Sequence, residues 1–132
     1  MAKKTHGTFS TRSGTGATRP ERAFQAWIIL VGMPMRRETT TYGQLGRHMF
    51  RKKAPGVNDK TLGHIAHYCD DHGLPQLNAL CVNETTGAPG ASIPLAAHEV
   101  HEEREKIYKI DWYNIRPPSP EDFKAASHKH FP

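Results

Sequence analysis

Three short motifs that can start helices divide this chain of 132 residues. In each, a Ser or Thr is followed three residues later by an acid or an amide, and the motifs begin at Thr18, Thr41 and Ser119. The hydroxyl of such a residue accepts a hydrogen bond from a backbone N–H of the first helical turn, whose donors lack partners within the helix. Pro20 and Pro120 fit the same turns, because a proline there gives up no needed donor. The motifs therefore predict a mainly α chain.

Apolar residues recur at helical spacing behind the first two motifs. The first stripe, at i, i+3, i+4 and i+7, consists of Phe24, Trp27, Ile28 and Val31. The second helix should end near Phe50, and its expected inward residues are Tyr42, Leu45 and Met49. This spacing is that of a helix with one face in a core.

A third helix, a strand and a turn-rich loop follow. Asn58 or Asp59 can cap the helix, and Gly73 can stop it. Its expected buried stripe is Leu62, Ile65, Ala66 and Cys69. Residues 76–82 are predicted to form a mostly buried strand, and residues 83–90 a loop suited to a wing. A fourth helix is expected from Pro94 to about Tyr108, and a last short helix should carry Phe123.

Positive charge is concentrated in the first part of the chain. Residues 1–60 contain 12 Lys and Arg against 3 Asp and Glu, whereas residues 61–132 contain 6 against 10. Residues 1–19 are polar, basic and nearly free of bulky apolar side chains, which predicts a disordered basic arm. The asymmetry favours a polyanion as the partner of the first part. A basic tail that only keeps the protein soluble is the alternative.

Helix, basic loop, helix, strand and glycine-bearing turn, in this order, are typical of a winged helix-turn-helix that binds duplex DNA. The loop at 51–56 carries three adjacent cations, and the helix that follows would point its positive N-terminal end at phosphate. The residues expected to bind DNA are Arg36, Arg37, Tyr42, Gln44, Arg47, Arg51, Lys52, Lys53, Lys60, Thr61 and His64.

Four fragments of the chain resemble one family in their order and approximate spacing. They are Phe24-Gln25-Ala26-Trp27, Thr41-Tyr42-Gly43-Gln44-Leu45, Lys60-Thr61-Leu62-Gly63, and Val82-Asn83 with Gly87. Over roughly residues 22–90 the chain is similar to the C-terminal DNA-binding domain of O6-alkylguanine-DNA alkyltransferases and their alkyltransferase-like relatives. The resemblance implies minor-groove binding and a base turned out into a pocket. It places Tyr42 against the phosphate of that nucleotide, and Lys60 near the arginine that fills the vacated stack.

The acceptor motif of that family, Pro-Cys-His-Arg, is missing here. The acceptor position falls on Asn78 or Ala79, and Cys81 is displaced from it by two or three residues. Without a thiolate at that position, transfer of an alkyl group to the protein is not expected. The resemblance therefore implies non-enzymatic DNA binding, for damage recognition or regulation, with no catalytic residues.

Neither a metal nor another cofactor is expected. Among nine histidines, the pairs His64/His67 and His98/His101 are each spaced i, i+3, but neither belongs to a recognisable ligand set. Two cysteines are too few for a disulfide framework in a chain of this length. The longest apolar run, at 26–34, is too short to span a bilayer. These features together predict a cytoplasmic protein that does not enter a membrane.

The expected organisation is mainly α with a small β wing. A disordered basic arm (1–19) precedes a winged helix-turn-helix-like domain (20–90), and a C-terminal helical extension (91–132) packs on the same domain. A different class of function stays open, namely a small protein-binding module or inhibitor that docks a partner through its acidic C-terminal half. A histidine-dependent metallohydrolase is a third hypothesis.

Overall fold

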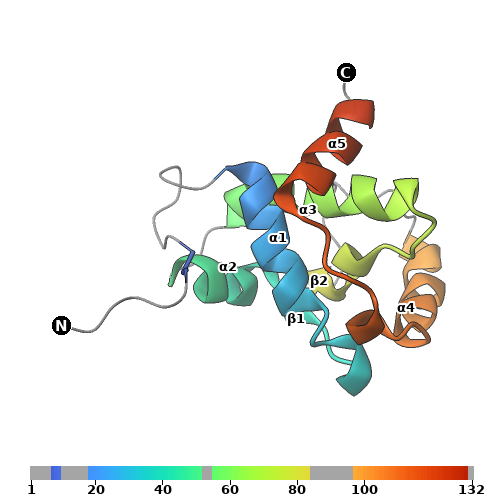
Figure 1. Cartoon of the computed structure of the whole chain (residues 1–132). Helices are drawn as coiled ribbons and strands as arrows, with labels where there is room; N and C mark the ends of the chain where they lie inside the picture. The colour runs from blue at the N-terminus through green and yellow to red at the C-terminus, as the bar shows by residue number, and fades with distance from the viewer. Residues whose placement is uncertain (1–6, 10–17, 52–54, 84–96, 131–132) are drawn as a thin grey trace.

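The computed structural model describes residues 7–9, 18–51, 55–83 and 97–130, which form a mainly helical protein with two very short strands (Figure 1). The α-helices are α1 (Arg19–Leu30), α2 (Tyr42–Phe50), α3 (Pro55–Asp71), α4 (Val100–Tyr108) and α5 (Pro120–His130). The strands are β1 (Thr40–Thr41) and β2 (Cys81–Val82). The 3-10 turns are η1 (Pro34–Arg36), η2 (Leu77–Leu80), η3 (Ala97–Glu99) and η4 (Trp112–Asn114).

The three capping motifs start helices where the sequence predicts them. Thr18 and Thr41 cap α1 and α2, because each hydroxyl accepts from the N–H three residues further on, at 3.4 and 3.1 Å. At α5, Asp122 N donates to Ser119 Oγ (3.2 Å), and Ser119 N donates to Asp122 Oδ2 (2.9 Å). These bonds satisfy donors that the helix itself leaves open, so the predicted starts are confirmed.

Helix α3 is longer than predicted at its N-terminal end. It begins at Pro55, and not at Asn58 or Asp59. A proline at the first helical position has a suitable φ and no N–H to satisfy, so the helix can start before the better-looking caps. Its end is as expected: Gly73 has φ +67°, and Leu74 N donates to Cys69 O at 2.9 Å. Lys60 is therefore the sixth residue of the helix and does not lie at its start.

The predicted strand at 76–82 is mostly a 3-10 turn. Residues 76–82 are buried, as predicted, but only Cys81 and Val82 form a strand. That strand pairs in parallel with Thr40 and Thr41. The pairing extends no further because α2 begins at Tyr42, directly after Thr41. A mainly α chain with a small sheet is confirmed. The expected wing lies almost wholly at 84–90, outside the described residues, as does the expected helix start at Pro94.

One core holds the helices together, and Trp27 lies at its centre. The Trp27 ring meets those of Trp112, Phe123 and Tyr68 with centroids 5.7, 5.9 and 5.6 Å apart. Since Trp112 and Phe123 follow residue 97, the C-terminal segment shares the core of the first helices, and α5 lies across α1 and α3 in Figure 1. The core side of α1 consists of Ala23, Ala26, Trp27 and Leu30.

One expectation about the apolar side chains of the first part is wrong. Ile28 was expected in the core stripe of α1, but 45% of its surface is exposed. The burial of Trp27 turns the helix so that Ile28 lies outside. Phe9 belongs to the segment expected to be a disordered arm, and its ring lies 6.0 Å from that of Phe24, centroid to centroid.

Candidate nucleic-acid interface

The outer face of α2 is a continuous polar stripe. Its four exposed residues follow one another at i, i+3, i+4 and i+7, and they are Gln44, Arg47, His48 and Arg51. The opposite face is buried through Leu45, Met49 and Phe50. We call the four exposed residues the α2 stripe. Its cations stand in the last turn and at the C-cap, where the negative end of the helix dipole favours positive charge.

No side chain of the α2 stripe has a hydrogen bond or an ion pair with any other residue that the structure describes. The nearest acids in sequence are Glu38 and Asp59. Glu38 pairs with Arg36 at 2.9 Å, and the side chain of Asp59 is not described. The described structure thus leaves the stripe without a neutralising acid, and its donors are open to an external anion.

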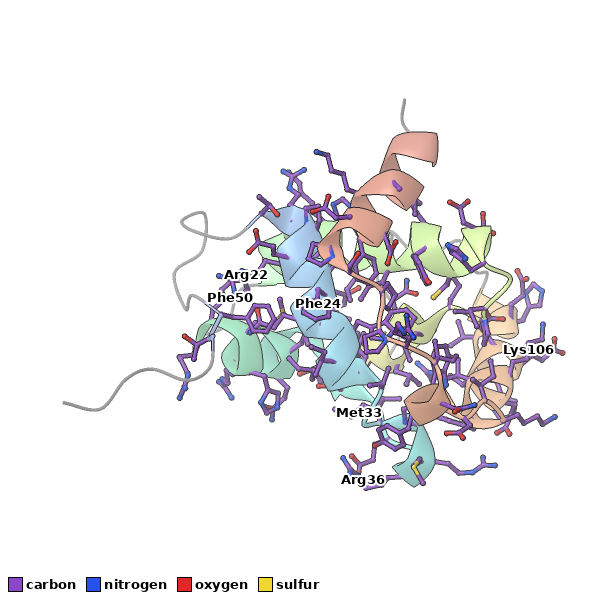
Figure 2. All side chains as sticks on the ribbon, viewed as in Figure 1. Arg22, Phe24, Met33, Arg36, Phe50 and Lys106 are labelled. Carbon is purple, nitrogen blue, oxygen red and sulfur yellow. The ribbon has the colours of Figure 1, made fainter. Side chains whose placement is uncertain are left out.

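A buried arginine supports the C-terminal end of α2. Arg22 on α1 is only 3% exposed, and its Nη1 donates to Gln25 Oε1 at 2.8 Å. The guanidinium carbon lies 4.5 Å from the centre of the Phe50 ring, an attractive cation–π distance, and Figure 2 shows the two side chains together where α1 meets α2. The pKa of Arg22 is lowered by burial, which outweighs the opposite effect of the nearby Glu21 carboxylate. Arginine keeps its charge in proteins, so a fixed positive charge lies beneath this end of α2.

Arg36 lies at η1, beyond the far end of α1 from Arg22 (Figure 2), and Arg37 is the residue that ends η1. Arg36 Nε is 2.9 Å from Glu38 Oε1. Arg37 Nη1 is 3.3 Å from Glu105 Oε1, and its guanidinium lies 4.9 Å from the centre of the Tyr108 ring. Both arginines were expected to bind DNA, but in this structure their guanidinium groups are already paired with carboxylates of the same chain.

Helix α3 offers less surface than predicted, because α5 packs along it. Lys60 is exposed, whereas Thr61 is fully buried and offers no surface to DNA in this structure. His64 is half-buried. Burial lowers its pKa most, followed by the nearby His67, whereas a hydrogen bond with the backbone of Phe123 on α5 raises it.

Tyr42 and the two loop lysines complete the predicted set. Tyr42 is the first residue of α2 and is half-buried, with its hydroxyl oxygen shielded from solvent. Lys52 and Lys53 follow Arg51 directly in sequence and lie outside the described residues.

The position that corresponds to the alkyl acceptor is closed to solvent. Asn78 and Ala79 lie in η2 and are fully buried, as are Cys81 and Cys69. Burial raises the pKa of the Cys69 thiol to about 12, which disfavours a thiolate at neutral pH. Neither amide atom of Asn78 has a hydrogen-bond partner among the described residues.

The acidic helix α4 uses part of its charge inside the chain. Glu103 Oε2 accepts a hydrogen bond from Gln76 N at 2.7 Å, and Arg104 Nε donates to Ala79 O at 3.3 Å. Together with the pair between Arg37 and Glu105, these contacts tie α4 to η2 and η1. They give two of its carboxylates a structural role, which leaves less negative surface for a docked partner.

Sequence reasoning missed two residues of this region. His48 belongs to the α2 stripe, and its spacing of four from Gln44 was a usable signal. Arg22 gave no signal, because an arginine in a first helical turn is usually exposed and only the packing of α1 on α2 buries it.

Comparisons with known proteins found no matching family model, no matching curated protein and no matching solved structure. Within the described ranges, no helix is both long and apolar enough to cross a membrane. In the same part of the chain, no three His, Cys, Asp or Glu side chains are grouped so that they could hold a metal ion.

Proposed function

We propose that this protein binds duplex DNA without catalysing a reaction, and that the α2 stripe is the centre of the interface. The observation that carries the proposal is the stripe itself, an exposed helical face with Arg47, His48 and Arg51 and no acidic partner among the described residues. Arginine binds phosphate oxygens through a planar fork of N–H groups, and neutralised phosphates release counterions that drive association.

Neighbouring features support the same surface. Lys52 and Lys53 extend the run of cations directly after Arg51, and Lys60 is exposed on the following helix. Gln44 adds an amide that can bond to phosphate or to a base edge. In this proposal α2 and α3 are the helix pair of a winged helix-turn-helix, and α2, whose outer face is open, makes most of the contacts.

The resemblance to alkyltransferase-like proteins supports a role in damage recognition or regulation. In this reading a base is turned out beside Tyr42, with Lys60 near the vacated stack. The buried Asn78 and Ala79 at the acceptor position support binding without alkyl transfer. Plain duplexes and duplexes with O6-methylguanine distinguish the two roles, since only a damage recogniser should prefer the second.

The test is a titration of both duplexes at 50 and 200 mM salt by fluorescence anisotropy. With about four phosphate contacts, affinity should fall on the order of a hundredfold between these concentrations. The double variant R47A/R51A should weaken binding and reduce the salt slope. The matched control is K124A, which removes an exposed cation from α5 and should leave binding unchanged.

Three results would contradict the proposal. The first is an affinity for duplex DNA that does not change with salt, and the second is no binding at 50 mM. The third is an equal loss of affinity in the control and in the double variant, because the α2 stripe would then have no special part.

A further inference from the structure

Two residues other than glycine have a left-handed backbone in the described part of the chain, and both are arginines. Arg37 has φ 52° at the end of η1, and Arg51 has φ 66° at the end of α2. An L-residue is strained in this region because its Cβ crowds the backbone, and helices that end this way usually have Gly or Asn there. An arginine at such a position calls for a physical reason.

The reason for Arg37 lies within the chain. Its guanidinium is 3.3 Å from Glu105 and 4.9 Å from the centre of the Tyr108 ring, both on α4. These contacts offset the backbone strain and fix η1 against α4. At Arg37 the side chain thus stabilises the fold through contacts within the chain, which gives a reason for an arginine at this strained position.

Arg51 has the same backbone without such contacts. Its N–H donates to Arg47 O at 3.0 Å and closes α2, a bond that Gly or Asn would form with less strain. Its side chain is exposed and has no hydrogen bond, ion pair or ring contact with any residue in the described ranges. Nothing that the structure describes uses the guanidinium, which leaves it available to a partner outside the described residues.

We propose that Arg51 is the residue that anchors a DNA phosphate on this protein. Its left-handed backbone holds it at the C-terminal end of the α2 stripe. The proposal rests on the DNA binding proposed above and adds the residue that fixes the sugar-phosphate backbone on the surface. The C-terminal end of α2 alone would repel a phosphate, since it is the negative end of the dipole. The guanidinium groups of Arg47 and Arg51 reverse the sign of the charge there.

The start of α3 follows Arg51 closely in sequence, and it carries charge of the same sign. Pro55 is four residues after Arg51, so chain length alone keeps the Cα of Pro55 within about 14 Å of that of Arg51. The N-terminal end of a helix carries partial positive charge and free N–H groups.

The experiment separates backbone strain from phosphate binding with substitutions at one position. R51G and R51N relieve the strain and remove the charge, R51K keeps both the strain and a charge, and R37G is the matched control at the other left-handed arginine. The melting temperature and the DNA affinity at several salt concentrations are measured for each variant.

R51G and R51N should melt at or above the wild-type temperature, yet bind DNA about tenfold more weakly, with a salt slope smaller by about one. R51K should keep the salt slope and lose only part of the affinity, because an ammonium cannot make the bidentate contact. R37G should melt lower, having lost the contacts with Glu105 and Tyr108, whereas K124A on α5 should keep the wild-type salt slope.

Two results would overturn the inference. If wild type binds DNA and R51G binds as tightly with the same slope, Arg51 is not the anchor, while the proposed function stands. If R51G melts well below wild type, the side chain stabilises the fold and the strain argument fails. Absence of DNA binding by the wild type is a different result, because it removes the proposed function itself.

Discussion

The rings of Trp27 and Trp112 meet edge to face, at an interplanar angle of 74° and with centroids 5.7 Å apart. Trp112 Nε1 also donates to Ile107 O at 2.8 Å, so the indole is fixed by both packing and a hydrogen bond. The contact joins the first helix to the segment after α4. It makes the C-terminal part a component of the core and not an appended tail.

Replacing Trp112 by Ala should therefore destabilise the whole protein. Trp112 is 3% exposed, and loss of a buried aromatic ring from a core costs about 3–5 kcal/mol in the free energy of unfolding. Urea denaturation followed by circular dichroism measures this loss. Y113A is the control: Tyr113 is 59% exposed, and its loss should change stability by no more than about 0.5 kcal/mol.

Asn78 should be dispensable for stability although it is fully buried. Its amide has no partner among the described residues, and an unsatisfied buried polar group costs about 1–3 kcal/mol. Removing it should offset most of the packing lost in N78A, whereas L77A in the same turn should cost about 2–5 kcal/mol. Equal losses in the two variants would mean that water or undescribed chain satisfies the amide.

Stability should fall as the pH drops below about 6.5, in part because of His64. Burial lowers the pKa of His64 in the folded state below its ordinary value of 6.5, so the unfolded chain takes up the proton first. The contribution of His64 to the free energy of unfolding is complete above pH 6.5. It is lost as the pH falls towards the pKa of His64 in the folded state. Melting temperatures at pH 7.5 and 5 measure it.

The variant H64Q should reduce this pH dependence. H101Q is the control, since His101 is exposed on α4. If both substitutions change the dependence by the same amount, burial against α5 is not its cause.

Both cysteine thiols should resist modification in the folded protein. Cys69 and Cys81 are fully buried, and burial raises the pKa of Cys69 to about 12. At pH 7.5 a thiol reagent such as DTNB should react slowly with native protein and quickly with two thiols per chain in denaturant. DNA with a radiolabelled O6-methylguanine should leave the chain unlabelled. Stoichiometric label on Cys81 would show that the acceptor position was misassigned.

The sequence by itself determined where α1, α2 and α5 begin. Their caps are local, since a hydroxyl and an N–H three residues apart meet whatever the rest of the chain does. It also determined which side of α3 is buried, because apolar residues at helical spacing can enter a core only on one face. The α2 stripe follows from the same periodicity, and three of its four members were predicted.

Only the tertiary structure decided which predicted site residues are free to bind. Arg37 meets Glu105, 68 positions away in sequence, and no local pattern contains that pair. Thr61 is fully buried, and His64 is half-buried beside the backbone of Phe123 on α5. Of the strand predicted at 76–82, only two residues form a strand, because the partner strand β1 offers only two residues for pairing. Helix starts and apolar periodicity depend on neighbours along the chain, whereas exposure, ion pairing and strand length depend on segments that only folding brings together.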